Sequence, residues 1–180
     1  MFETERLRLR AARKADFEKV HALFNNVSVH KMLSTGFVVP VLDSKLEKDL
    51  PTSISESLLY VIIETKDSGE FIGYTRLFGH SYKNRDAMLG MALLPEFWGR
   101  GYATEVLTFI IDYAFQQLAM HRISLDVSGN NTAAIKVYKR VGFVQEGVKR
   151  KVNWMDGKWQ DDILMAVLDE DWAASRQENV

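Results

Sequence analysis

The sequence predicts an α/β fold with a mixed, mostly antiparallel central sheet and helices on both faces of that sheet. The first observation is a hairpin pattern, in which the apolar runs 58–65 and 71–80 are separated by the turn sequence KDSGE. The second is an alternation of strand-like and helix-like segments over 87–141, typical of a sheet covered by helices. The third is a closing pair of strand-like runs, 143–154 and 158–168, joined by an Asp-Gly turn signal.

The N-terminal third begins with a strand and a helix. Residues 6–12 alternate apolar and basic side chains, which indicates a half-buried strand. Residues 14–26 place apolar side chains on one helical face, and Asp16 near the start favours the helix dipole. In the region that follows, residues 44–50 (SKLEKDL) indicate a short helix, which we expect Pro51 to interrupt.

The second half carries the clearest element boundaries. The run 87–94 has the character of a buried strand, and an apolar helical stripe follows over 101–119. A further strand over 122–127 leads to a helix over 131–141, which Gly142 ends. The closing residues DWAASRQENV have the composition of a loose tail.

Length and composition indicate one ordinary globular domain, which we expect over 1–172 with a C-terminal tail over 173–180. The chain has 180 residues, of which 47% are hydrophobic and 26% are charged, and its net charge is −1. This charge indicates neither a nucleic acid nor an anionic membrane as a partner. The N-terminus lacks a signal-peptide pattern and no apolar run has membrane-spanning length, so we expect a cytoplasmic protein.

The residue types also exclude several chemistries. The chain has no cysteine, which excludes disulfides, thiolate zinc sites and a cysteine nucleophile. Its four histidines, His21, His30, His80 and His121, are scattered without the spacing of metal ligands, so no metal is expected.

The stretch PEFWGRGYATEV, residues 95–106, has the order strand end, loop and helix start. Consecutive backbone N–H groups at a helix N-terminus, where the dipole is positive, form a ready site for phosphate. Gly99 and Gly101 would let the backbone approach the anion closely. The pattern is neither a P-loop nor a dinucleotide fingerprint, because no Gly-Lys-Ser/Thr follows and Thr104 occupies the third glycine position. A tight strand-to-helix turn without a ligand is the alternative.

Two motifs together resemble the GCN5-related N-acetyltransferase (GNAT) superfamily. The loop signature Q/R-x-x-G-x-G/A is matched by WGRGYA, except that Trp98 replaces Gln or Arg. The later signature N-x-x-A-x-x-x-Y-x-x-x-G-F is matched by Asn131, Ala134, Tyr138, Gly142 and Phe143. The resemblance implies the acyl-CoA N-acyltransferase fold and an enzyme that uses acetyl-CoA as its co-substrate, with no metal.

Three longer stretches narrow the resemblance to the ribosomal-protein N-terminal acetyltransferases of the RimJ/RimL type. They are ETERLRLRAARKADFE, LPEFWGRGYATE and the closing GFVQEGVKRK to DW segment. This subgroup implies transfer of acetyl to a protein or peptide N-terminal amine by direct attack in a ternary complex. The same pattern covers spermidine acetyltransferases, so a small amine such as spermidine or spermine is the alternative acceptor. A non-catalytic acyl-CoA sensor is an alternative of another class, and a homodimer is a family expectation.

The resemblance also implies roles for single residues. The backbone of the loop would hold the pyrophosphate through Gly99, Arg100, Gly101, Tyr102, Ala103 and Thr104. Ala92, Leu93 and Leu94 would pair with the pantetheine amides, and a backbone N–H there would stabilise the developing oxyanion. Asn131 would contact the pantetheine arm, although Asn is also a good helix N-cap.

Tyr138 would be the general acid that protonates the departing CoA thiolate, with a packed aromatic as its alternative. Many relatives carry a glutamate base in the strand before the loop, and this chain has Met88 there. The remaining candidates for the base are Glu105, Asp126 and Asp86, and a water chain is the further alternative. The sequence identifies neither the acceptor nor a pathway.

Overall fold

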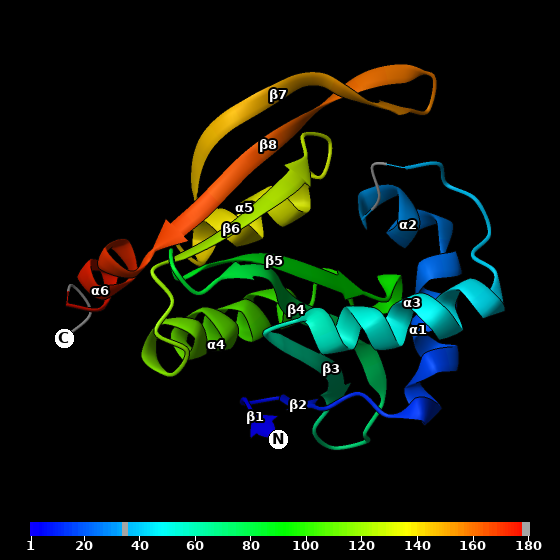
Figure 1. The fold of residues 1–180 in the computed structure, drawn as a ribbon, viewed down its shortest axis with the longest axis horizontal. Coiled ribbons are helices and arrows are strands. Elements are labelled where there is room, and N and C mark those ends of the chain that lie inside the picture. Colours follow the sequence, from blue (N-terminus) through cyan, green and yellow to red (C-terminus); the bar gives the residue numbers. More distant parts are fainter. Residues whose placement is uncertain (34–35, 178–180) are drawn as a thin grey trace.

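A single mixed sheet organises the protein, in the strand order β1-β2-β3-β4-β5-β6-β8-β7 (Figure 1). The computed structural model describes residues 1–33 and 36–177. The strands are β1 (Phe2–Glu3), β2 (Leu7–Arg10), β3 (Leu59–Thr65), β4 (Phe71–Ser81), β5 (Asp86–Leu93), β6 (Arg122–Ser128), β7 (Val144–Met155) and β8 (Lys158–Leu168). Neighbouring strands are antiparallel except β5 and β6, which are parallel, so the predicted mixed, mostly antiparallel sheet is confirmed.

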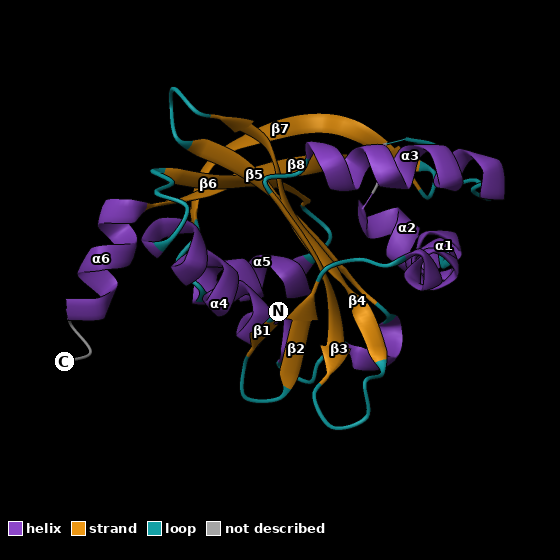
Figure 2. Ribbon diagram, turned by 60° about the horizontal axis from the view of Figure 1, so that its bottom comes forward, coloured by secondary structure: helices purple, strands orange, loops and turns teal. Residues whose placement is uncertain are grey.

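Helices cover both faces of the sheet, as predicted (Figure 2). The helices are η1 (Lys14–Asp16), α1 (Phe17–Asn25), α2 (Val27–Leu33), α3 (Asp43–Glu56), η2 (Pro95–Phe97), α4 (Tyr102–Gln116), α5 (Thr132–Arg140) and α6 (Asp169–Gln177). The larger core packs α4 and α5 on one face through buried side chains such as Val106 and Ile110. A smaller core packs α1 and α3 on the other face, where Leu23, Leu46 and Leu50 meet Tyr74.

The parallel pair β5 and β6 separates soon after it forms. The two strands pair only over Asp86–Met88 and Arg122–Ser124. Beyond this point β5 continues along β4 as far as Leu93, while β6 continues along β8 as far as Ser128. The backbone groups on the open side of β5 therefore have no strand partner, and a gap forms in the middle of the sheet.

Helix α3 corrects the expectation that Pro51 interrupts a short helix over 44–50. The helix runs from Asp43 to Glu56 with Pro51 inside it. Proline removes a backbone hydrogen bond and normally kinks or ends a helix. Here Leu46 and Leu50, which precede the proline, are 8% and 4% exposed, so their burial offsets the local loss.

The C-terminus corrects the expectation of a loose tail in the closing residues. Helix α6 occupies Asp169–Gln177, so the tail expected over 173–180 is wrong for 173–177, and residues 178–180 lie outside the described part of the chain. The indole of Trp172 donates to Asp112 Oδ1 at 2.7 Å and packs against Phe115, with ring centroids 5.6 Å apart. Trp172 in the sequence already indicated that this segment packs against the domain, because its large apolar ring is stabilised by burial.

Two further properties follow from the described helices and side chains. Within residues 1–33 and 36–177, no helix is long and apolar enough to cross a membrane. In the same residues no group of three or more His, Asp or Glu side chains is arranged to hold a metal ion.

Candidate active site

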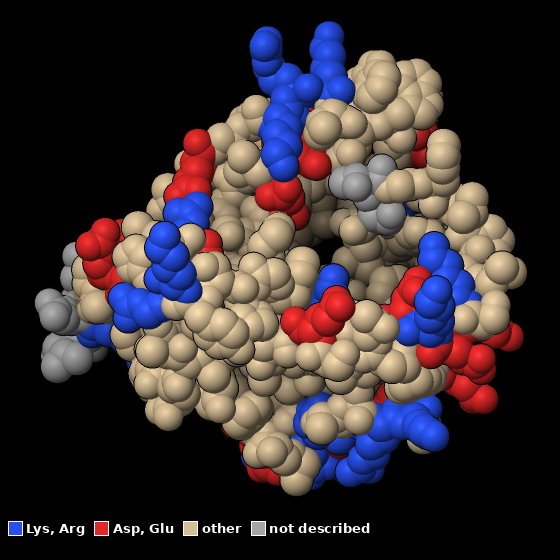
Figure 3. All heavy atoms as spheres, in the orientation of Figure 1, with Lys and Arg blue, Asp and Glu red and all other residues tan. Residues whose placement is uncertain are grey.

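A cleft of about 930 Å³ runs through the gap between β5 and β6 and continues beneath α1–α3. Figure 3 shows the molecule hollowed on this face, with uncharged atoms and charged side chains of both signs around the opening. The cleft has two parts. One, here called the glycine arm, is lined by the start of α4 and by α5, including Gly99, Gly101, Asn131 and Tyr138. The other, here called the aromatic arm, is lined from β3, β4 and α1–α3, including Phe24, Tyr60, Tyr74, Arg76 and Phe78.

The loop before α4 presents a row of free donors to the glycine arm. Gly99 and Gly101 have φ angles of +72° and +81°, a left-handed conformation that favours glycine. Gly101 is the N-cap of α4 and no side chain caps this helix. Within the described chain, the backbone N–H groups of residues 99–104 have no protein acceptor. A Cβ added to Gly99 would meet nothing within 4 Å, so the backbone is open to a ligand. Residues 101–104 carry the four N–H groups that any uncapped helix N-terminus leaves free, and Gly99 and Arg100 extend this row into the geometry that a phosphate site requires.

Glu105 lies outside the cleft, which corrects its assignment as a candidate base. Its carboxylate accepts hydrogen bonds from the Thr4 hydroxyl, from Arg6 N at 2.8 Å and from Arg6 Nε at 2.7 Å. Burial favours the neutral acid, but these donors outweigh it and lower the pKa of Glu105. A carboxylate with a lowered pKa that is fully engaged in hydrogen bonds is a poor base. It instead ties the N-terminal turn to α4. Arg6 also donates to the Arg100 carbonyl at 2.9 Å, which holds the loop from behind.

The hydrogen-bond alternation of β5 determines which of the three residues predicted to contact pantetheine direct backbone groups into the gap. Leu94 N donates to Ile72 O at 2.9 Å, on the β4 side. Because strand residues alternate in direction, the backbone groups of Ala92 also face β4, whereas those of Met91 and Leu93 face the gap. Met91 was therefore missed, since its role depends on which neighbour β5 pairs with.

Trp98, the residue that departs from the loop motif, fixes the end of β5. Its indole Nε1 donates to the Leu93 carbonyl at 2.8 Å. The carbonyl of Leu93 is therefore occupied, and the N–H of Leu93 remains directed into the gap. The substitution thus joins the loop to the strand that precedes it.

Tyr138 lies on α5 and lines the same cleft. Its ring packs against Phe143, with centroids 5.6 Å apart, and this packing does not remove the residue from the cleft lining. Among the described residues its hydroxyl has no hydrogen-bond partner. Burial raises the pKa of Tyr138 to about 12, so the phenol stays protonated at neutral pH and has a proton to donate.

Asn131 begins α5 and also lines the cleft. Its side-chain oxygen accepts from Ala134 N at 3.2 Å, which makes it the N-cap of this helix. Its position in the lining leaves the amide group available to a ligand as well.

Two carboxylates line the cleft, and only one of them was predicted. Asp126 on β6 pairs with Lys149, whose Nζ lies 2.7 Å from Asp126 Oδ2. Asp49 on α3 was missed, because the region around it carried no motif. Asp86 is absent from the lining and starts β5 opposite Arg122. Met88, at the position where the family resemblance would place a glutamate, lines the cleft.

Comparison with known proteins agrees with this geometry. Residues 6–144 match the family model described as an acetyltransferase (GNAT) domain. The spermidine N(1)-acetyltransferase of Vibrio cholerae is 29% identical over 163 residues, covering 90% of this chain and 92% of that protein. The putative ribosomal N-acetyltransferase YdaF of Bacillus subtilis is 28% identical over 108 residues, or 60% of this chain and 59% of that protein.

A solved structure has the same fold. The crystal structure of spermidine N-acetyltransferase from Vibrio cholerae in complex with CoA and spermine has a TM-score of 0.82 and 27% identity, covering 93% of this chain and 98% of that one. The match of the family model to most of the chain, together with the glycine loop and Tyr138 in one cleft, settles the family. The chain belongs to the GNAT family of acetyltransferases, and acetyl-CoA is its acetyl donor.

Proposed function

We propose that the protein acetylates the α-amine of a peptide or related molecule by direct attack in a ternary complex. The observation that carries this proposal is the continuity of the cleft, in which the glycine arm and the aromatic arm meet along β5. Acetyl-CoA in one arm and an amine in the other would meet without an acyl-enzyme. The chain has no cysteine that could form a thioester intermediate.

Each part of the glycine arm has a role in this proposal. The free N–H groups of residues 99–104 would hold the pyrophosphate, and Asn131 would contact the pantetheine arm. The N–H groups of Met91 and Leu93 are the donors available in the gap for the pantetheine amides and the thioester carbonyl. Tyr138 would donate its proton to the departing sulfur.

Removal of a proton from the acceptor ammonium needs a base or a water path. Asp126 is the predicted base candidate that the structure leaves in the cleft. Its carboxylate pairs with Lys149 through one oxygen, Oδ2, and lies among the cleft-lining residues. We propose that it acts through water.

The charge of the cleft supports a peptide-type acceptor over a polyamine. Its charged lining residues are Lys45, Asp49, Arg76, Asp126 and Arg140. Three of these are cationic, and one of the two acids is already paired with Lys149. A polyamine carries several positive charges and needs several free carboxylates. The named relatives favour spermidine, whereas this lining favours an acceptor with a single amine.

We propose one N-acetyltransferase domain over residues 1–172, a cytoplasmic location, and a homodimer. Sedimentation at micromolar concentration tests the last of these, and a monomer there would contradict it.

Release of free CoA from acetyl-CoA, measured with an amine panel, tests the acceptor. The panel contains short peptides with free N-termini, the same peptides blocked at the N-terminus, spermidine and spermine. We expect a kcat/KM for a free peptide at least about tenfold above that for spermidine, a difference of about 1.4 kcal/mol. Equal or reversed values would exclude the proposed acceptor. Tight acetyl-CoA binding with no turnover on any amine would instead favour a non-catalytic acyl-CoA sensor.

A further inference from the structure

The aromatic arm contains a guanidinium group that has no carboxylate partner. Arg76 lies on β4, donates through Nη1 to the hydroxyl of Ser53 on α3, and lies over the Phe78 ring at 4.0 Å from its centroid. No ion pair joins it to a carboxylate within residues 1–33 and 36–177. A guanidinium in a mostly apolar cleft is poorly solvated, so it favours an anionic partner.

A buried hydroxyl group beside Arg76 also has no partner. Tyr60 is 9% exposed, and its hydroxyl has no hydrogen-bond partner in the described structure. Its ring is stacked on that of Tyr74, with centroids 5.2 Å apart and planes at 1°. Tyr60 lies directly opposite Arg76 in the antiparallel pair of β3 and β4, and Tyr74 lies two residues before Arg76 on β4, so the three side chains lie on one face of the sheet. Burial raises the pKa of both phenols, and the positive charge of Arg76 opposes this effect. An unsatisfied buried hydroxyl is unfavourable unless a ligand supplies an acceptor.

The nearby charges on α3 leave the positive charge of Arg76 in excess. Asp49 lies one helical turn before Ser53, and Lys45 lies one turn before Asp49. Both line the cleft and carry opposite charges, so they largely offset each other. Asp49 is exposed and forms no ion pair with Arg76. The deep part of the arm therefore offers hydrogen-bond donors and positive charge.

Gly90 on β5 makes room for this arrangement. A Cβ at Gly90 would lie 3.4 Å from Arg76 Nε and 3.3 Å from the Phe78 ring. The guanidinium therefore packs directly over the backbone of β5, beside Met91. Because this strand lines the meeting point of the two arms, a group bound to Arg76 would lie near the reacting amine.

We propose that Arg76, with the hydroxyls of Tyr60 and Ser53, forms a carboxylate subsite that selects the acceptor. The inference rests on the proposed function and deepens it. The acceptor is a primary amine on an apolar body that carries a carboxylate within about one residue of the amine. The carboxylate comes from a free amino acid or from an acidic first side chain of a peptide, and both sources offer the same group to Arg76.

Matched acid and amide pairs test the proposal. Phenylalanine and phenylalaninamide test the α-carboxylate, and the C-terminally amidated dipeptides Glu-Ala and Gln-Ala test the acidic side chain. In at least one of the two pairs, we expect the kcat/KM for the acid to be about 10–100-fold above the kcat/KM for its amide. In Arg76→Gln this preference of the acid over its amide should fall to less than about threefold, and Arg76→Lys should restore part of it. Tyr60→Phe should reduce it by about 3–10-fold.

A second measurement separates this subsite from the proposed function. Calorimetric binding of the N-acetylated acids and amides in the presence of CoA reports carboxylate recognition without turnover. Lys48→Gln, which removes a positive charge from the exposed side of α3, is the matched control. Acid-selective product binding that Arg76→Gln abolishes would support the subsite even if no acceptor in the panel turned over. Equal binding of acids and amides, or equal losses for both in Arg76→Gln, would overturn it.

Discussion

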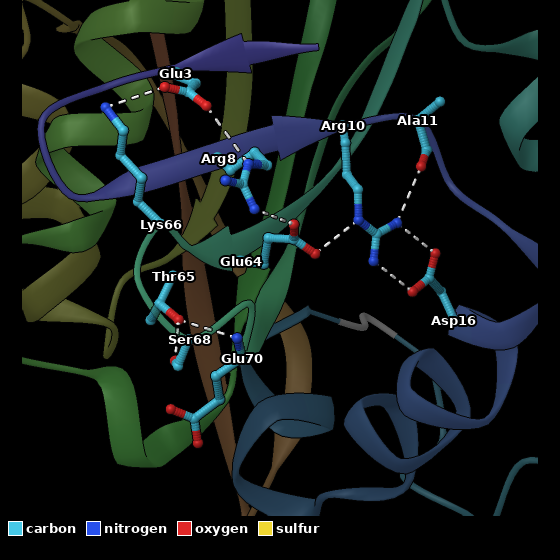
Figure 4. Close-up of polar contacts among 10 residues, drawn as sticks. All are labelled: Glu3, Arg8, Arg10, Ala11, Asp16, Glu64, Thr65, Lys66, Ser68 and Glu70. Carbon is cyan, nitrogen blue, oxygen red and sulfur yellow. Dashed lines mark hydrogen bonds and ion pairs between the residues drawn. The ribbon is translucent and has the colours of Figure 1, made fainter.

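Arg10→Met is expected to lower the free energy of unfolding by about 3–5 kcal/mol, because Arg10 neutralises two buried carboxylates. Figure 4 shows its guanidinium between Glu64 on β3 and Asp16 at the start of α1. Arg10 Nε lies 2.7 Å from Glu64 Oε2, while Nη1 and Nη2 lie 2.7 Å and 2.8 Å from the two oxygens of Asp16. The exposed fractions of Asp16 and Glu64 are 3% and 8%. Methionine would fill much of the volume and leave both charges unpaired.

The size of the effect follows from this burial. Breaking a buried pair by removing one partner leaves an uncompensated charge, and here two carboxylates lose their main partner. Glu64 retains a contact with Arg8 Nη1 at 3.3 Å, which limits its loss. For a domain of this size, about 3–5 kcal/mol corresponds to a drop in Tm of roughly 6–20 °C. The control Arg8→Met removes a partly exposed arginine that contacts Glu64 and, through Nε at 3.5 Å, Glu3, and it should lose about 1 kcal/mol or less.

The pH dependence gives the sharper test. The hydrogen bonds from Arg10 lower the pKa of Asp16 against the opposing effect of burial. In the wild type this stabilisation is present above the unfolded pKa of about 3.9 and is lost as the pH falls through the lower folded value. In Arg10→Met, burial acts without the guanidinium, so the pKa of Asp16 rises and protonation relieves the unpaired charge at higher pH. The difference between the two proteins should therefore be largest near neutral pH and smaller near about pH 4.

Urea unfolding at pH 7 and pH 4, followed by circular dichroism, measures this difference. A loss below about 1 kcal/mol at pH 7, or a loss of the same size at both pH values, would refute the reasoning. Arg10 also joins the sheet to α1, whose Phe24 lines the aromatic arm. The variant should consequently raise KM for the acceptor more than that for acetyl-CoA.

Three further predictions concern the reaction itself. Tyr138→Phe should lower kcat by about 10²–10⁴-fold at every pH up to about 10, because the wild-type phenol, with its pKa of about 12, stays protonated over this range. An unchanged kcat would exclude Tyr138 as the general acid. Gly101→Ala should weaken CoA binding, measured by calorimetry, about 5–30-fold, because a left-handed alanine costs about 1–2 kcal/mol. The control Gly69→Ala also has a positive φ, +69°, but lies in a turn outside the cleft lining, so its CoA affinity should be unchanged. Equal CoA affinities of the two variants would contradict the loop assignment. Asp126→Asn should lower kcat about 10-fold or more, with partial recovery at higher pH, where the amine is already neutral. Glu105→Gln should lower the Tm and leave kcat nearly unchanged, because Glu105 holds the N-terminal turn to α4. A large loss of kcat in Glu105→Gln together with an unchanged kcat in Asp126→Asn would contradict the placement of these two carboxylates.

Much of the glycine arm could be predicted because its signals are local. Gly99 and Gly101 precede the apolar stripe of α4, and Asn131 and Tyr138 lie in one short segment. The periodicity of strands and helices, turn residues and caps depend on neighbours a few residues apart, so the sequence carries them directly. The N-cap role of Asn131 and the course of α4 illustrate this.

Long-range neighbours explain what could not be predicted. Glu105 has the right chemistry for a base, but Thr4 and Arg6, about a hundred positions earlier in the chain, engage it outside the cleft. Met91 faces the gap only because β4 lies on the other side of β5. In the same way, α3 continues through Pro51 because its leucines are buried against another part of the sheet.

By itself, the sequence determined the order of most elements, the anion-binding loop and the tyrosine of the family motif. Only the tertiary structure decided which carboxylates reach the cleft, which backbone groups face the gap, and that Arg76, Tyr60 and Ser53 come together from β4, β3 and α3. The reason is physical: local patterns fix backbone conformation within a few residues, whereas side-chain neighbours depend on strand order and register, which burial of the whole core selects.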